Sequence, residues 1–238
     1  MLLSKFQQEK NRPPSYLFKG VFWDFSAGIR LKIPNFAFSF NSGTMSDFQY
    51  FKLFKPYGYL SQFVNNQTTR KNKKKLGELH DFPEGTMAIG RLDEDSEGLL
   101  FLTTDGQMSE IVRGKTIEKE YYVQVDGTIT SAAIQQLKRG VEIGFGGGKY
   151  LTKECHVFKL ECKPDFPERS KKIRDDRHGP TSWVSITITE GKFRQVKKMT
   201  AAVGFPTLRL VRIRIGNELL DNMQPGEVVT VTSFDLKG

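Results

Sequence analysis

The hydrophobic pattern is sharpest in residues 89–106, where the apolar run LLFL (99–102) is followed by the dipeptide DG (105–106). A short apolar run closed by a turn predicts a buried β-strand. Directly before the run stand Asp93, Asp95 and Glu97. We therefore expect these acidic residues on a tight loop at the mouth of a rigid strand, where reactive groups often lie. Their spacing alone is more typical of a turn whose carboxylates bond nearby backbone N–H groups.

The rest of the pattern predicts more strands than helices. Apolar and alternating segments indicate strands over residues 48–54, 118–125, 151–162, 183–189, 208–215 and 227–231. Helical spacing and capping residues indicate helices after Asp105, after Thr130 (131–139) and over 193–203. Because no regular strand–helix–strand alternation is present, we expect an α+β fold: a mixed, mostly antiparallel central sheet with flanking helices.

The glycine-rich segment GFGGGK (144–149) resembles a phosphate-binding loop only superficially, because Tyr150 stands where that loop needs Ser or Thr. We expect it to form a hairpin loop.

The composition is that of an ordinary soluble protein, with 38% hydrophobic and 26% charged residues among 238. No apolar run approaches the roughly 20 residues needed to span a membrane. The net charge of +9 favours nucleic acid over a membrane as partner. Cys155 and Cys162 would lie on opposite faces of an unbroken strand, so we expect free thiols and a cytoplasmic location. No Cys-x-x-Cys pair is present, and we expect no metal.

Residues 1–44 differ in character from the remainder of the chain. They hold nine aromatic residues, and six basic residues face two acidic ones without a clear helical or strand period. They contain no secretory signal. We expect a poorly ordered N-terminal extension that need not be native, with translation beginning at Met45, and a folded domain over residues 45–238.

The segment over residues 193–203 predicts an amphipathic helix with Val196 and Met199 on its apolar face. Arg194, Lys197 and Lys198 fall broadly opposite. Such a basic face is ordinarily solvated, although a cation on it could also hold Asp93 ionised by direct pairing. Tyr121, in a predicted strand, is ordinarily a core residue, although a tyrosine can also stack on a flipped base.

Together these segments resemble a known family. The stretches GRLDEDSEGLLFLTTDG (90–106), EKEYYV (118–123) and EGKFRQVKKMTAAVGFPTLRLVRIRIG (190–216) are similar to the RsuA/RluB/RluE/RluF family of ribosomal RNA pseudouridine synthases. The segments KPYGYLSQF (55–63) and 180–212 look most like its RluE branch, which modifies large-subunit rRNA. The resemblance covers about residues 48–232.

The resemblance implies the pseudouridine synthase fold and isomerisation of one uridine in large-subunit (23S) ribosomal RNA, without cofactor or metal. It implies that Asp93 is the catalytic aspartate, acting as a nucleophile at ribose C1′ or promoting elimination across the sugar. Tyr121 would pack against the flipped uracil, Lys197 would pair with Asp93, and Arg91 would contact the RNA backbone or hold the nucleotide out. We expect a monomer that binds ribosomal RNA and no membrane.

Two departures from the family pattern bear on these expectations. The RluE branch commonly has RQVRRM where this chain has RQVKKM, and lysine lacks the planar fork that grips a carboxylate with two bonds. The partner of Asp93 is therefore either Lys197 or Arg194. Residues 1–44 are also too short for, and unlike, the S4 RNA-binding domain of many relatives, so no S4 domain is expected.

RNA contacts must then come from the catalytic domain. Besides Arg194 and Lys198, the candidate phosphate contacts lie in the basic loop before residue 76 and in the linker over 171–177: Arg70, Lys73, Lys74, Lys75, Arg174 and Arg177. The basic loop could equally be only a solubilising surface.

Two other functions compete with the isomerase. A non-catalytic RNA-binding or ribosome-assembly protein could retain the same fold. A hydrolase using Asp93 with Asp95 or Glu97 is disfavoured, because glycosidase carboxylates normally come from separate elements about 5–10 Å apart.

Overall fold

The computed structural model describes residues 48–64, 72–114 and 116–236, which all lie within one compact unit, Ser46–Gly238. In these residues no helix is long and apolar enough to cross a membrane. The predictions for residues 1–44, including those about the extension and the S4 domain, lie outside the described residues.

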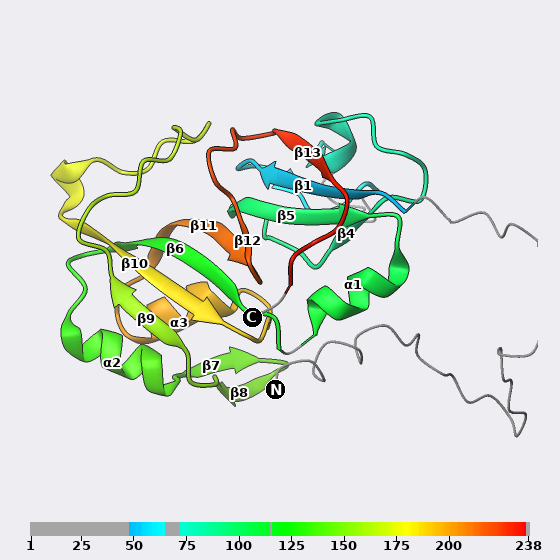
Figure 1. Ribbon diagram of the computed structural model, residues 1–238. Coiled ribbons are helices and arrows are strands. Elements are labelled where there is room, and N and C mark those ends of the chain that lie inside the picture. Colours follow the sequence, from blue (N-terminus) through cyan, green and yellow to red (C-terminus); the bar gives the residue numbers. More distant parts are fainter. Residues whose placement is uncertain (1–47, 65–71, 115, 237–238) are drawn as a thin grey trace, which may run out of the picture. The chain divides into compact units, whose positions relative to one another are not determined.

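Within the described ranges a nine-stranded sheet forms the centre of this unit (Figure 1). Seven strands follow one another in the order β13-β1-β5-β11-β6-β10-β9, while β12 pairs with β11 and β4 pairs with β5. Their bounds are β1 Tyr50–Lys55, β4 Met87–Ile89, β5 Glu97–Thr103, β6 Lys119–Asp126, β9 His156–Lys159, β10 Thr181–Ile188, β11 Thr207–Ile215, β12 Glu218–Leu219 and β13 Val228–Val231. Among these pairings only β5–β11 is parallel, which confirms the predicted mixed, mostly antiparallel sheet.

Short elements complete the described part of the chain. Two small sheets pair β2 (Tyr59–Leu60) with β3 (Lys74–Lys75) and β7 (Glu142–Phe145) with β8 (Gly148–Leu151). The sheet of β7 and β8 is the hairpin predicted at the glycine-rich segment. The helices are α1 (Gly106–Arg113), α2 (Ser131–Arg139) and α3 (Gln195–Ala202), with 3-10 turns η1 (Leu76–Glu78) and η2 (Asp176–His178).

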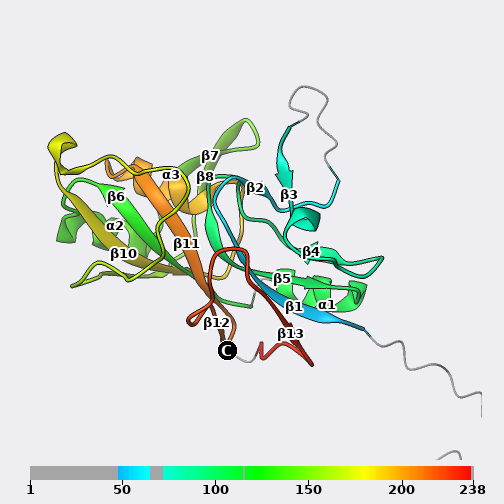
Figure 2. The same ribbon diagram turned by 90° about the horizontal axis from the view of Figure 1, so that it is seen from above.

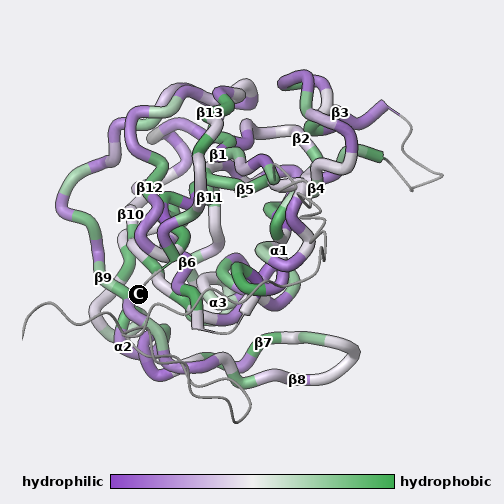
Figure 3. Tube along the Cα trace, turned by 45° about the vertical axis from the view of Figure 1, so that its right-hand side comes forward, coloured by the Kyte–Doolittle hydropathy of each residue, from purple (hydrophilic) through white to green (hydrophobic). Residues whose placement is uncertain are grey.

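Strand β5 is buried along its whole length, and its tube is green in Figure 3. Leu99 and Phe101 face a cluster that includes Val112 of α1, whereas Leu100 and Leu102 face the opposite cluster, which includes Leu76 of η1. A strand covered on both faces needs apolar residues at consecutive positions, and this explains the unbroken run in the sequence.

The helices begin where their capping residues predict. The carboxylate of Asp105 accepts hydrogen bonds from the N–H groups of Gln107 and Met108, and the hydroxyl of Thr130 accepts one from Ala133. Helices α2 and α3 pack on the half of the sheet formed by β6, β10 and β11, through residues such as Leu137 and Met199. Helix α1 packs on the other half, beside β5 (Figure 1).

The two halves meet at the parallel pairing of β5 with β11, which we call the central seam. Its register joins Glu97 to Val211 and Gly98 to Arg212. Gly98 has a φ of 106°, and a Cβ atom there would lie 2.3 Å from the carbonyl oxygen of Arg212. Only glycine therefore permits this approach of the two backbones.

The predicted strand over residues 151–162 was wrong, and so was the placement of both cysteines on one strand. The structure has β8 ending at Leu151 and β9 beginning at His156, with Cys155 and Cys162 free and outside both. Between the strands, backbone N–H groups bind elsewhere: Thr152 to the Val141 carbonyl, Lys153 to the Glu190 carboxylate and Cys155 to the Lys138 carbonyl. These distant acceptors turn the chain away from the sheet.

Substitution of Gly98 by alanine should lower the free energy of unfolding by about 3 kcal/mol or more, because it combines a positive φ with a collision against backbone. Gly204→Ala is the matched control: its φ is 87°, but nothing lies within 4 Å of the added Cβ atom. It should cost only about 1 kcal/mol. Urea unfolding of both variants measures the difference; equal losses would show that the seam tolerates the added methyl group.

Candidate active site

The acidic residues lie on the loop that leads into β5, which we call the acidic loop (residues 90–96). Ser61 clamps its backbone: the hydroxyl donates to the Leu92 carbonyl at 2.8 Å and accepts from the Leu92 N–H at 2.9 Å. The N–H of Gly58 donates to the Glu94 carbonyl at 2.8 Å. The turn after β1 thereby fixes the position of Asp93.

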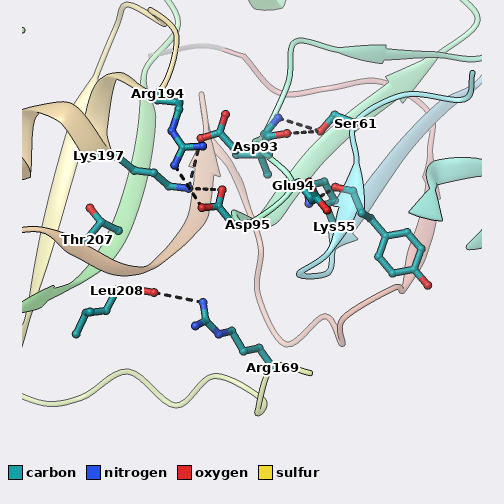
Figure 4. Close-up of polar contacts among 12 residues, drawn as sticks. Lys55, Ser61, Asp93, Glu94, Asp95, Arg169, Arg194, Lys197, Thr207 and Leu208 are labelled. Carbon is teal, nitrogen blue, oxygen red and sulfur yellow. Dashed lines mark hydrogen bonds and ion pairs between the residues drawn. The ribbon is translucent and has the colours of Figure 1, made fainter. Parts of the chain in front are cut away.

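Lys55, the last residue of β1, is fully buried beneath this loop (Figure 4). Its ammonium donates to the carbonyls of Pro56, at 3.0 Å, and Tyr59, at 2.7 Å. Burial lowers the pKa of Lys55 to about 7, even though the carboxylates of Glu97, Asp95 and Asp93 favour the charged form. Lys55 thus braces the turn that holds the acidic loop.

Two cations, one in α3 and one directly before it, point toward the acidic loop (Figure 4). Lys197 Nζ lies 2.5 Å from Asp95 Oδ1 and 3.4 Å from Asp93 Oδ2, whereas Arg194 Nη2 lies 3.4 Å from Asp95 Oδ2. Burial raises the pKa of Asp95, but the hydrogen bond and charge of Lys197, together with the charge of Arg194, leave that pKa below its ordinary value. Lys197 contacts Asp93 as predicted, but its shorter contact is with Asp95.

The loop before α3 is held in place by the buried carboxylate of Glu190. It accepts hydrogen bonds from the Tyr150 hydroxyl at 2.6 Å, the Lys153 N–H at 2.9 Å and the Gln195 amide at 2.6 Å. Arg194 then adopts a left-handed conformation, with φ 53°, directly before the helix. This turn brings Arg194 and Lys197 to the same carboxylate.

A cavity of about 70 Å³ opens beside Asp93 and reaches Tyr121 on β6. Its lining combines residues of the acidic loop, β6, β10, β11 and the segment that starts α3: Leu92, Asp93, Ser96, Tyr121, Ile188, Gly191, Lys192, Arg194, Gln195, Val196 and Leu210. Asp93 keeps 24% of its side chain exposed, against 13% for Lys197. The structure therefore places Asp93 and Tyr121 on the wall of one cavity, with Lys197 in contact with Asp93.

The other carboxylates of this region are occupied. Glu97 is buried in a two-bond ion pair with Arg209, with distances of 2.9 and 2.8 Å. Glu94 pairs with Lys73, and Asp95 with Lys197. Asp93 makes no side-chain hydrogen bond within the described part of the chain, and it is the carboxylate that faces the cavity. Among the described residues, no three His, Cys, Asp or Glu side chains gather as a metal site.

A family model for RNA pseudouridylate synthases matches residues 49–202. The chain belongs to the RNA pseudouridylate synthase family. Two similar curated relatives are both named ribosomal large subunit pseudouridine synthase E. The one from Xanthomonas campestris pv. campestris is 42% identical over 73% of this chain and 90% of its own length. The one from Vibrio vulnificus is 43% identical over 73% of this chain and 70% of its own length. A crystal structure described as a pseudouridylate synthase matches with a TM-score of 0.59 and 29% identity, over 77% of this chain and 70% of that one.

In this pseudouridylate synthase, the basic residues expected to contact RNA differ in whether they already have a partner within the protein. Arg91 is exposed and makes no ion pair within the described ranges, and Lys198 donates to the Gly144 carbonyl. Lys73 is paired with Glu94 and Arg174 with Asp126. The remaining candidates also have neighbours: Lys74 lies over the Tyr59 ring, Lys75 is half-buried in β3, and Arg177 pairs with Asp175. Arg70 lies outside the described residues.

Sequence reasoning missed Lys55, Ser61, Ser96 and Glu190 as parts of this synthase site. Ser96 is buried and lines the cavity, and its hydroxyl has no hydrogen-bond partner among the described residues. The partner of Ser61 lies 31 positions away in sequence, and two of the partners of Glu190, Lys153 and Tyr150, lie 37 and 40 positions away, so local spacing could not reveal these contacts. For Lys55, the signal was a charged residue continuing an aromatic strand in YFKLFKP (50–56).

The titration of Lys55 should make stability depend on pH. The pKa of Lys55 is about 7 in the folded protein, whereas its ordinary value is 10.5. Between pH 7 and pH 10.5 the Lys55 amine is therefore largely protonated in the unfolded chain and largely deprotonated in the folded protein. The free energy of unfolding then rises with pH in this window, by about 2 kcal/mol from pH 7 to pH 9. Lys55→Met should lack this rise.

Denaturant unfolding of both proteins at pH 7, 8 and 9 measures the effect as a difference. Burial also lowers the pKa of Lys119, to about 8. Because Lys119 is present in both proteins, its contribution to the pH dependence cancels when the two curves are subtracted. Parallel pH curves for wild type and Lys55→Met would contradict the assignment.

Proposed function

We propose that this synthase converts a specific uridine of large-subunit ribosomal RNA to pseudouridine, with Asp93 as its catalytic residue. The observation that carries the proposal is that Asp93, alone among residues 93–97, combines a partly exposed carboxylate, no side-chain hydrogen bond within the described residues and a place on the cavity wall. The substrate follows from the two relatives named as large-subunit synthases.

The reaction needs a carboxylate at the ribose of a nucleotide that has left its helix. An ionised Asp93 can attack C1′, or it can promote elimination across the sugar by removing the C2′ proton, and either route breaks the N-glycosidic bond. C1′ then bonds to base C5 as the bond to Asp93 breaks or the C2′ proton returns, and the C5 proton is lost while N1 gains one. Lys197, at 3.4 Å, offsets the carboxylate charge and orients it. Tyr121 packs against the flipped uracil on the facing wall of the cavity. The Ser96 hydroxyl supplies a hydrogen bond to the same nucleotide.

The RNA backbone is bound by exposed cations that the fold has not already paired. Arg91 lies on the acidic loop, next to Asp93 but outside the cavity lining. In the linker after β9, Lys171 and Lys172 are exposed and line a second cavity of about 400 Å³ with Arg174. On the side of α3, Lys198 adds charge, and so does Arg194, although Arg194 also pairs with Asp95.

Replacement of Asp93 by asparagine should abolish turnover, by about 10³-fold or more, while RNA binding is retained, because the substitution removes the reactive oxygen charge and keeps the side-chain shape. The measurement is pseudouridine mapping of rRNA from cells that lack this gene, complemented with wild type or Asp93→Asn. One missing site restored only by the wild type names the uridine. Restoration by Asp93→Asn would favour the non-catalytic RNA-binding protein instead.

Replacement of Lys171 and Lys172 by glutamine should weaken RNA binding and reduce the slope of log affinity against log salt concentration by about 0.7 to 0.9 per lost phosphate contact. The control changes the same charge elsewhere: Lys138, at the end of α2, and Lys153, before β9, both replaced by glutamine. Filter binding across a salt series compares the two variants. An unchanged slope for the linker variant would remove Lys171 and Lys172 from the RNA contacts.

A further inference from the structure

Two phenylalanine side chains are exposed beside the cavity. Phe193, in the loop before α3, is 68% exposed, and Phe145, in the β7–β8 hairpin, is 40% exposed. A single exposed apolar residue needs no explanation. These two come from segments almost 50 positions apart, and the hairpin lies beside α3 in both ribbon views (Figures 1 and 2).

Each exposed ring is paired with a cation. Lys198 Nζ lies 5.2 Å from the centre of the Phe193 ring. Lys192 Nζ lies 5.0 Å from the Phe145 ring and 4.8 Å from the Tyr150 ring, and these two rings are 6.1 Å apart. We call Phe145, Tyr150 and Phe193 the aromatic rim. Rings interleaved with ammonium groups are the combination that binds single-stranded nucleic acid, because bases stack on rings and phosphates bind cations.

The aromatic rim is held by polar contacts. Lys198 Nζ donates to the Gly144 carbonyl at 2.7 Å, which ties α3 to the hairpin. The Tyr150 hydroxyl donates to Glu190, the residue that also binds Gln195 at the start of α3. A surface fixed in this way loses little conformational entropy when it binds a ligand.

The rim borders the cavity that contains Asp93. Lys192 and Arg194, the immediate neighbours of Phe193 in sequence, both line that cavity, together with Gly191. A chain that inserts one nucleotide beside Asp93 therefore passes the rim with the nucleotides next to it.

We propose that the aromatic rim is a stacking platform for unpaired bases of the RNA that flank the target uridine, with Lys192 and Lys198 at their phosphates. This inference rests on the proposed function and deepens it, because it assigns the state in which the substrate is bound: the bases that flank the target uridine are unpaired in the complex. Bases paired in a helix present their faces to one another and leave none for these rings.

The test uses the full chain and a single-stranded 12-mer oligouridylate, free or annealed to oligoadenylate. Phe193→Ala should weaken binding of the single strand about tenfold, the loss expected for one stacked base, with an unchanged salt slope. Phe193→Trp should retain affinity. Lys198→Gln should instead reduce the salt slope. Binding of the duplex should be unaffected by the changes at Phe193.

The matched control is Phe158→Ala, which removes a ring that is 50% exposed on the edge strand β9 and contributes to neither the rim nor the cavity. It should leave the affinity unchanged. Equal affinities of Phe193→Ala and wild type for the single strand, or equal losses with the duplex, would overturn the platform.

Turnover on large-subunit rRNA is measured in parallel to separate the two proposals. If the wild type is active and Phe193→Ala binds the single strand as tightly as the wild type does, only the platform is refuted. A wild type without activity on any large-subunit rRNA refutes the proposed function, even if the Phe193-dependent binding is present. An active Phe193→Ala with raised KM and unchanged kcat supports both.

Discussion

The buried ion pair of Glu97 with Arg209 is the interaction on which the rest of the site depends. It crosses the central seam, where β5 and β11 share a parallel register of only two residue pairs. The desolvation of two charges is costly, so the pair contributes more to a unique arrangement than to net stability. Its two parallel bonds fix the direction of approach as well as the distance. Asp93 comes from one side of this seam and Tyr121, Arg194 and Lys197 from the other, so the seam sets their separation.

The main elements of the fold could be predicted because their signals are local. The apolar run of β5 and the caps at Asp105 and Thr130 lie within a few residues of the structure they specify. The segment 152–155 was misassigned because its backbone donors bind Val141, Glu190 and Lys138, which are distant in sequence. Periodicity cannot detect an acceptor that only the folded chain supplies.

The site shows the same difference between local sequence signals and contacts that only the folded chain supplies. Asp93, Tyr121 and Lys197 were predicted because they lie in motifs that resemble a known family, and the structure places Asp93 and Tyr121 on the wall of one cavity, with Lys197 in contact with Asp93. The sequence could not show which acidic and basic side chains form ion pairs. Lys73 and Arg174 look like free surface cations in sequence, but each is paired with a carboxylate across the fold.

This sharing of charge explains how a site with four acidic residues in five positions can face a polyanion. Glu94, Asp95 and Glu97 are matched by Lys73, Lys197 and Arg209, and Arg194 adds a second cation at Asp95. The negative charges are therefore compensated inside the protein before an RNA phosphate approaches, and exposed cations such as Arg91 set the outer field. Asp93 has the longest contact with Lys197 and an open side toward the cavity. Its neighbours are held by closer ion pairs, so Asp93, which we propose as the catalytic residue, is the most weakly paired of these four carboxylates.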